Sequence, residues 1–194
     1  MTTRERIIEA TVDFFKQQAN YERITLTKVA KRARIGKSTV YEHFRSKEDL
    51  VEETCSYMFE SYERTLFEPL EIASFSGAFR KQVERILTVM RDARTIIDVL
   101  FSHEQGAMIP LDSQALEVRA RAFKTRMDKR FEAIFSQGRT EGRFPKTKDP
   151  NARFVISAII SGLLYQYVNG EIALSEEQLL DLIERECVRV LQGK

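Results

Sequence analysis

The chain has 194 residues, of which 43% are hydrophobic and 31% charged, and its net charge is +2. This length allows one large domain or a small domain joined to a larger one, and the composition is too apolar for a disordered chain. Cys55 and Cys187 lie far apart without metal-ligand spacing, and no apolar run reaches the ~20 residues that cross a bilayer. We therefore expect a cytoplasmic protein with no metal, no cofactor, no signal peptide and no membrane span.

Positive charge is concentrated near the N-terminus. Residues 20–47 carry eight Lys or Arg and two acidic residues, whereas residues 51–194 carry twenty basic and twenty-two acidic residues. A local basic patch on an otherwise near-neutral chain is typical of a surface that binds phosphates. A solvated helix face would carry the same charge, so the patch alone leaves both interpretations open.

The first three predicted elements are helices. Thr2 and Glu5 form a possible capping box before a helix that runs to about residue 18, and a second helix follows over residues 26–34. In the third, over residues 37–44, Val40 and Phe44 share one inward face. Its outward residues all carry hydrogen-bond donors: Lys37, Ser38, Thr39, Tyr41 and His43. Two short helices with donors on the second predict a helix-turn-helix, whose second helix enters the DNA major groove.

The rest of the chain is also predicted to be helical. Ser46 and Asp49 form a possible capping box for a long helix that ends near Phe67, before Pro69. Further helices are expected over residues 77–89, 93–101 and 113–137, with a loop over residues 102–112. After a Gly/Pro-rich break, Asp149 is expected to cap a helix that reaches residue 170, and Ser175 with Gln178 caps the last helix. The predicted fold class is all-α.

Residues 24–50 read "ITLTKVAKRARIGKSTVYEHFRSKEDL". This stretch resembles the DNA-binding region of the tetracycline-repressor-like (TetR/AcrR) family of bacterial transcription regulators. The resemblance covers about the first fifty residues. It implies a DNA-binding domain over residues 1–47 and a larger helical ligand-binding and dimerisation domain over residues 48–194.

The resemblance also implies roles for individual residues. Thr27, Lys37, Ser38 and Thr39 are expected near bases or their phosphates, and the DNA backbone is expected to contact Thr25, Lys28, Tyr41, His43 and Lys47. Arg34 stands where the family commonly has the turn glycine, and Gly36 stands where it commonly has a capping hydroxyl. Either Gly36 takes the unusual backbone conformation, or Arg34 adopts a positive φ at a cost of ~1 kcal/mol and adds a phosphate contact.

Two further sites are predicted in the second domain. Apolar side chains and one histidine are candidates for a cavity that binds a largely apolar ligand: Met90, Phe101, His103, Met108, Phe123 and Met127. Residues 154–164 are apolar on nearly all sides, which indicates cover by more than one neighbouring helix. With the last helix, and by the family resemblance, they predict a homodimer interface at Ala158, Ser161, Gly162, Tyr165, Leu179, Ile183, Cys187 and Val190. An internal buried helix is the alternative.

The predicted function is a sequence-specific transcription regulator that acts as a repressor at a palindromic operator and is released by a small, largely apolar ligand. The alternative is a helical protein-interaction module without DNA specificity. A small helical enzyme is disfavoured because the sequence has no P-loop, GxGxxG or GxSxG motif. His103 and Glu104 lack the second histidine of a zinc-protease helix, and the two cysteines are expected to be packing residues rather than redox sensors.

Overall fold

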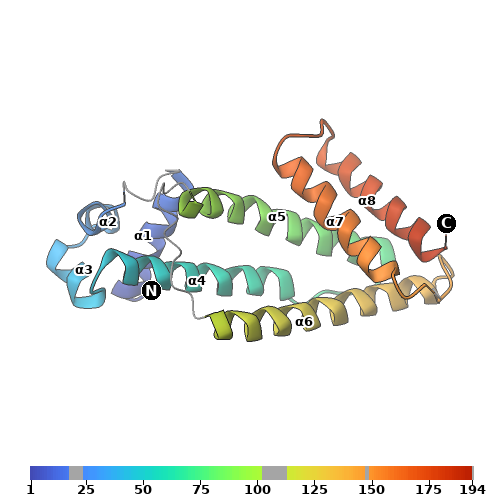
Figure 1. Cartoon of the computed structure of the whole chain (residues 1–194), viewed down its shortest axis with the longest axis horizontal. Helices are drawn as coiled ribbons and strands as arrows, with labels where there is room; N and C mark the ends of the chain where they lie inside the picture. The colour runs from blue at the N-terminus through green and yellow to red at the C-terminus, as the bar shows by residue number, and fades with distance from the viewer. Residues whose placement is uncertain (18–23, 102–112, 147–148, 194) are drawn as a thin grey trace. The chain divides into compact units, whose positions relative to one another are not determined.

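The structure, a computed structural model, describes residues 1–17, 24–101, 113–146 and 149–193, with all their side chains except those of residues 95–101, 113–117 and 120. Every regular element in this part of the chain is an α-helix, so the all-α prediction is confirmed (Figure 1). The helices are α1 (Thr3–Gln17), α2 (Leu26–Ala33), α3 (Lys37–His43), α4 (Lys47–Phe67), α5 (Phe75–Phe101), α6 (Ser113–Thr140), α7 (Ala152–Val168) and α8 (Glu176–Leu191).

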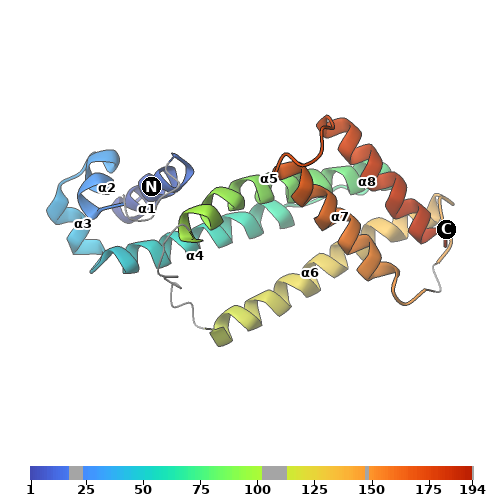
Figure 2. The same ribbon diagram turned by 45° about the horizontal axis from the view of Figure 1, so that its top comes forward.

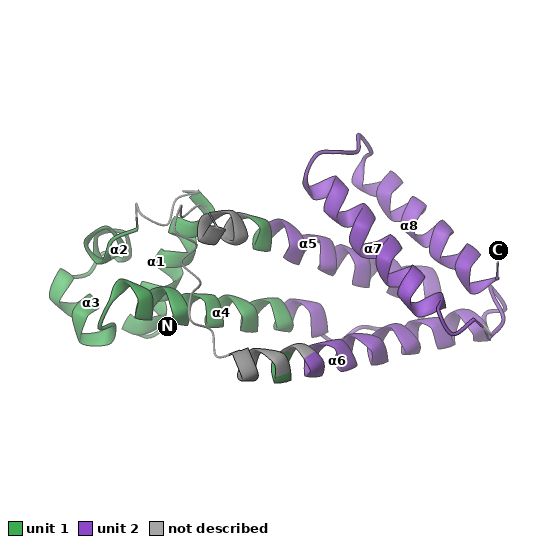
Figure 3. Ribbon diagram, viewed as in Figure 1, with its two compact units in different colours: residues 1–64, 92–119 green, residues 65–91, 120–194 purple. Residues whose placement is uncertain are grey.

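The chain folds into two compact units, which Figure 3 shows in different colours. Unit 1 comprises residues 1–64 and 92–119, and unit 2 comprises residues 65–91 and 120–194. Helices α4, α5 and α6 each carry the chain from one unit into the other, because all three boundaries fall inside helices. The functional division at residue 47 stays a prediction.

The core of unit 1 joins α1, α2, α3 and the first part of α4. Ile7, Phe15, Val29, Val40 and Leu50 come from these four helices, and none of their side chains is exposed. Burying a large aliphatic or aromatic side chain contributes roughly 1.5–3 kcal/mol. The three N-terminal helices are therefore held against α4 by a shared apolar core.

In unit 2, α7 and α8 lie side by side, as the views in Figures 1 and 2 both show. Phe75, Phe79, Ile134, Leu164 and Leu179 form the fully buried centre of the core. Phe75 stacks on Phe79 with ring centroids 5.5 Å apart. The core of unit 2 therefore combines residues from α5, α6, α7 and α8.

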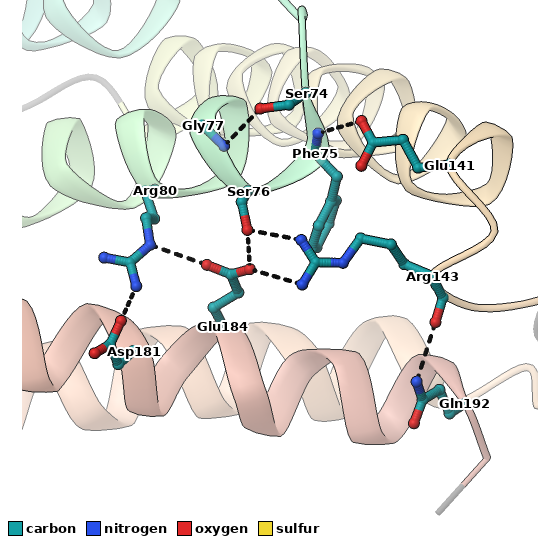
Figure 4. Close-up of polar contacts among 10 residues, drawn as sticks. All are labelled: Ser74, Phe75, Ser76, Gly77, Arg80, Glu141, Arg143, Asp181, Glu184 and Gln192. Carbon is teal, nitrogen blue, oxygen red and sulfur yellow. Dashed lines mark hydrogen bonds and ion pairs between the residues drawn. The ribbon is translucent and has the colours of Figure 1, made fainter.

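A polar cluster around the buried carboxylate of Glu184 joins α5, α8 and the segment after α6 in unit 2 (Figure 4). Glu184 is 8% exposed and accepts a hydrogen bond from Arg80 Nε at 3.0 Å. Arg143 Nη2 lies 3.4 Å from the same carboxylate, and Arg143 Nη1 donates to Ser76 Oγ at 2.7 Å. The Ser76 hydroxyl donates to Glu184. A buried carboxylate needs such partners, because an unpaired charge in a protein interior is strongly unfavourable.

Two of the predicted capping boxes are confirmed. Glu5 N donates to Thr2 Oγ1 at 3.2 Å and Thr2 N donates to Glu5 Oε2 at 2.7 Å. Gln178 N donates to Ser175 Oγ at 3.2 Å, and Ser175 N donates to Gln178 Oε1 at 2.9 Å. In both cases a hydroxyl and a long polar side chain three residues later satisfy donors that the helix leaves unpaired.

The predicted box at the start of α4 is only half formed. Asp49 N donates to Ser46 Oγ at 3.1 Å, as expected. The Asp49 carboxylate, however, accepts from Arg45 N at 2.9 Å. A short Asp side chain therefore ties down the connection between α3 and α4.

Two predicted helix boundaries are wrong. The expected helices over residues 77–89 and 93–101 form one continuous α5, because nothing between them breaks a helix. Helix α7 begins at Ala152 and not at Asp149, whose carboxylate accepts from Asn151 N at 2.8 Å in a turn that precedes the helix. The loop predicted over residues 102–112 lies outside the described residues.

Candidate nucleic-acid interface and ligand cavity

Helix α2 begins with a side-chain cap and buries one face. Thr25 has extended backbone angles, and its Oγ1 accepts from Lys28 N at 3.3 Å. Leu26, Val29 and Ala30 point into the core of unit 1. A threonine hydroxyl that accepts one bond keeps its own O–H to donate, so the Thr25 cap remains able to bind a phosphate oxygen.

The turn between α2 and α3 settles which residue takes the unusual conformation. Arg34 has φ 55° and ψ 47°, in the left-handed region, whereas Gly36 has φ −68°. Ile35 N donates to Ala30 O at 3.0 Å and Arg34 N donates to Lys31 O at 3.3 Å, the paired bonds of a Schellman motif. Arg34 is therefore the residue that bears the backbone strain, and Gly36 has an ordinary extended conformation.

Helix α3 separates a buried face from an exposed one. Val40 and Phe44, at the end of α3, are fully buried. Lys37 and Ser38 are exposed, and Tyr41 is 51% exposed, with Lys37 Nζ 5.7 Å from the centre of its ring. Tyr41 thus presents part of its ring and its phenolic hydroxyl to solvent, one helical turn from Lys37.

The nine residues predicted to contact DNA all lie in unit 1, from the N-cap of α2 to the start of α4. Six are exposed, namely Thr25, Thr27, Lys28, Lys37, Ser38 and Tyr41. Thr39, His43 and Lys47 are partly buried. No residue predicted for DNA contact is buried, so all nine remain accessible to a duplex.

Sequence reasoning missed Arg4 as a residue that positions α3. Its Nη1 donates to His43 O at 3.3 Å, it forms an ion pair with Glu53, and its guanidinium lies 4.9 Å from the centre of the Phe44 ring. These contacts join α1, the end of α3 and α4. No local pattern could have indicated them, because Arg4 and His43 are 39 residues apart.

Unit 2 contains an apolar cavity of about 380 Å³. Three of the predicted ligand-binding residues, Met90, Phe123 and Met127, line it. The other wall residues include Leu66 at the end of α4, and the ion pair of Asp128 with Arg153 lies at the wall. Of the remaining predicted residues, the Phe101 side chain, His103 and Met108 lie outside the described part of the chain.

The residues predicted for the dimer interface fall into two groups. Ala158, Ser161 and Tyr165 are exposed on α7 and Gly162 is partly buried, so these form a continuous outer stripe with Phe154, which is 68% exposed. Ser161 also lines the cavity.

The residues predicted on α8 require a correction. Leu179, Ile183 and Cys187 are fully buried, and they pack in the core of unit 2 rather than on a free surface. Val190 is partly buried against the same core. The apolar stripe of α8 therefore faces its own chain, and the free apolar surface of this helix pair lies mainly on α7.

Both cysteines are buried packing residues. Burial raises the pKa of the Cys55 thiol to about 11 and that of Cys187 to about 12, with neighbouring glutamates adding to the effect. Among the described residues, no three His, Cys, Asp or Glu side chains are placed to hold a metal ion, and no helix could span a membrane.

Comparison with known proteins assigns the N-terminal part of the chain directly. Residues 7–54 match the sequence profile described as "Bacterial regulatory proteins, tetR family". The match includes α2, α3 and all nine residues predicted to contact DNA. No curated protein matches the chain.

Solved structures match nearly the whole chain. A TetR transcription regulator from Haloarcula marismortui is 16% identical, with a TM-score of 0.63 over 98% of this chain and 97% of that one. A putative TetR-family regulator from Vibrio parahaemolyticus is 17% identical, with a TM-score of 0.60 over 96% and 97%. The flavonoid-responsive regulator FrrA is 24% identical, with a TM-score of 0.58 over 98% and 96%. Residues 7–54 therefore carry the DNA-binding domain of the tetR family, and the chain as a whole shares the fold of TetR-family regulators.

Proposed function

We propose that this protein is a homodimeric repressor that binds a palindromic operator and is released from it by a small, largely apolar ligand. The observation that carries the proposal is the division of α3 into two faces. Val40 and Phe44 hold the helix on the core, while Lys37, Ser38 and Tyr41 present donors to solvent. This is the arrangement that a recognition helix in the major groove requires.

The contact residues differ in what they can recognise. Lys37, Ser38 and Thr39 begin α3 and are proposed to reach base edges or nearby phosphates, with Thr27 from α2. Thr25, Lys28, Tyr41, His43 and Lys47 are proposed to bind the backbone of the duplex. Phosphate contacts set position and affinity for any sequence, whereas contacts to base edges set the preferred sequence.

The outer stripe of α7 supports the homodimer. Phe154, Ala158, Gly162 and Tyr165 recur at helical spacing, and a Cβ added to Gly162 would meet no atom of its own chain within 4 Å. Small residues between exposed aromatic ones allow a second helix to approach closely. A two-fold dimer places two copies of α3 for two half-sites, which is why the operator is proposed to be palindromic.

A substitution at Gly162 tests the dimer. Gly162→Leu fits the protomer but obstructs a partner helix, so sedimentation equilibrium should show a shift towards monomer. Ala122→Leu adds the same side chain at an exposed site on α6 and should leave the dimer unchanged. A dimer of equal strength in both variants would exclude α7 as the interface.

The cavity in unit 2 supports the ligand. Its wall is mostly Met, Phe, Leu and Ile side chains, and its volume of about 380 Å³ suits a small molecule. Helix α4 begins shortly after α3, and its other end reaches the cavity, where Leu66 is part of the wall. A ligand that displaces this end of α4 is proposed to change the separation of the two DNA-binding heads, with a coupling of ~1–3 kcal/mol.

The decisive experiment is selection of bound sequences from a random duplex library by the purified protein. We expect the enriched sequence to be palindromic. The logarithm of its affinity for the protein should fall steeply and linearly with the logarithm of the salt concentration, because each phosphate contact releases counterions. Tyr41→Ala and Lys47→Ala should weaken binding to all sequences, whereas Lys37→Ala or Thr39→Ala should change the preferred sequence. Lys124→Gln, which removes one positive charge from α6, is the control and should leave binding unchanged.

Failure of the selection would have a clear meaning. If the folded dimer enriches no sequence, and the four variants in α3 and α4 bind DNA like the parent, the helical interaction module becomes the better account. For the ligand, linkage provides a separate test: an effector that releases DNA must bind more weakly when operator is present. Equal effector affinity with and without operator would rule out the release mechanism and leave DNA binding intact.

A further inference from the structure

A second pocket in unit 2 has a chemistry opposite to that of the apolar cavity. It is an open groove of about 420 Å³ between one face of α6 and the segment that leaves α4. Phe67, Leu70 and Ile72 form its apolar side. The polar side comes from α6 and is entirely basic.

The basic side is a row on one face of a single helix. Arg126, Lys129 and Arg130 all line the groove, and their spacing of three and four residues places them on adjacent turns. Like charges at this spacing on a helix repel one another. Helix α6 therefore holds three positive charges close together, although like charges at this spacing lower the stability of a helix.

The described residues offer little to neutralise this row. No carboxylate in the described part of the chain forms an ion pair with any of the three. Four acidic residues adjoin the groove residues in sequence, namely Glu68, Glu71, Asp128 and Glu132. The Glu68 carboxylate is bound by Arg85 Nη2 at 3.3 Å, Asp128 pairs with Arg153 and Glu132 pairs with Arg139, while Glu71 is exposed. Arg130 Nη1 instead donates to the backbone oxygen of Glu68 at 2.9 Å. Burial and the charges of Arg85 and Arg126 lower the pKa of Arg130, as expected for cations without a counterion.

One of the three cations is held in position by the groove itself. The Arg126 guanidinium lies 3.9 Å from the centre of the Phe67 ring. Phe67 in turn meets Phe123 edge to face, with centroids 5.4 Å apart. A cation–π contact fixes the guanidinium but leaves its N–H donors to be satisfied by another acceptor.

From this combination we infer that the groove binds an organic anion with an apolar chain or ring. The carboxylate or phosphate head lies among Arg126, Lys129 and Arg130, and the apolar part lies on Phe67, Leu70 and Ile72. This site is separate from the apolar cavity, whose α6 residues Phe123 and Met127 lie on another part of the helix surface. The inference does not depend on DNA binding, because it concerns only unit 2.

Calorimetric titration of the full-length protein with decyl phosphate, below its micellar concentration, tests the inference. Decyl phosphate should bind at least about tenfold more tightly than decanol, because only the former offers charge-assisted hydrogen bonds. Decanoate should also bind, which would show that the groove requires an anionic head and not phosphate in particular. Decyltrimethylammonium, with the same chain and the opposite charge, should not bind at the groove.

Variants locate the site. Arg126→Gln and Lys129→Gln should each weaken decyl phosphate binding about five- to tenfold, since each removes one charge-assisted contact. Lys124→Gln removes the same charge from an exposed position of α6 outside the groove and should leave the affinity within about twofold. Ser157→Phe, which narrows the separate cavity, should also leave it unchanged. Circular dichroism confirms that each variant is folded.

Two results would overturn the inference. Equal affinity for decyl phosphate in the parent, Arg126→Gln and Lys129→Gln would exclude the groove. Loss of binding in Ser157→Phe, with the two groove variants unaffected, would place the molecule in the apolar cavity. Neither result bears on operator binding, which is measured separately.

Discussion

Replacing Arg34 separates the two roles that this residue combines. It holds a left-handed conformation, with φ 55° and ψ 47°, and it is exposed beside the proposed DNA-binding helix. Arg34→Gly and Arg34→Ala remove the same charge, but only glycine lacks the Cβ that makes this conformation unfavourable. A difference in stability between the two variants therefore reports the backbone, and a shared change in DNA affinity reports the side chain.

The difference in stability between the two variants can be estimated from the backbone conformation of residue 34. A Cβ in the left-handed region costs roughly 1–2 kcal/mol, while glycine gives back roughly 0.5–1 kcal/mol through the entropy of the unfolded chain. Arg34→Gly should therefore be about 1 kcal/mol more stable than Arg34→Ala. For a chain of 194 residues, this corresponds to a Tm difference of roughly 2–4 °C.

Urea unfolding of both variants measures this difference in stability. A salt titration of operator binding tests whether the Arg34 side chain contacts DNA. If the Arg34 side chain contacts a phosphate, both variants should reduce the slope of log affinity against log salt by about two, one for each protomer of the proposed dimer. Equal stability of the glycine and alanine variants would refute the assignment of strain to residue 34. A salt slope unchanged in both would remove Arg34 from the DNA contacts.

Three further predictions concern stability and are checked by denaturant unfolding. Gly138→Ala should destabilise the protein by roughly 1–3 kcal/mol, because the added Cβ would lie 2.4 Å from Phe144 Cζ, and this clash outweighs the better helix propensity of alanine. A variant as stable as the parent would show that the Phe144 ring can move aside without cost. Burial raises the pKa of the Cys55 thiol from 9.0 to about 11, so its contribution to the free energy of unfolding should be lost as the pH rises from 9 to 11. Cys55→Ala should therefore lose about 2 kcal/mol less stability than the parent over this pH range. An equal loss in both proteins would show that burial does not raise the pKa of this thiol. Glu184→Ala should destabilise the protein by roughly 2 kcal/mol, because it removes a buried carboxylate that Arg80, Arg143 and Ser76 contact. Glu186→Ala removes only ion pairs with exposed arginines and should cost under about 1 kcal/mol. Equal losses would show that the Glu184 contacts contribute no more than surface ion pairs.

Local signals in the sequence predicted the elements of this fold well. The pairs Thr2 with Glu5 and Ser175 with Gln178 each begin a helix, because both partners lie within one turn. The inward pair on α3 was equally readable, since residues four apart share a face. These are short-range rules, and they hold here without help from the rest of the chain.

The errors arise where the partner of a residue is distant or where two local partners compete. The spacing of Leu179, Ile183 and Cys187 indicated that one face of α8 is buried, but periodicity does not say which residues pack against it. In the structure this face packs into the core of its own unit. Asp149 could cap a helix or close a turn, and it closes a turn. Arg4 reaches His43 across 39 residues, a contact that only the tertiary structure reveals.

If the proposed dimer forms through the exposed stripe of α7, the concentration of the protein determines which fraction of it is dimeric. When Phe154 and Tyr165 are covered by a second copy, mass action raises the stability of the folded state with concentration, so Tm should increase as the protein is concentrated. Below the dissociation constant of the dimer, the population able to occupy two half-sites falls with the square of the total concentration. On the proposed function, a cell that halves its supply of the protein would lose more than half of its operator-bound dimer, and the strength of the α7 contact would set the concentration at which this loss begins.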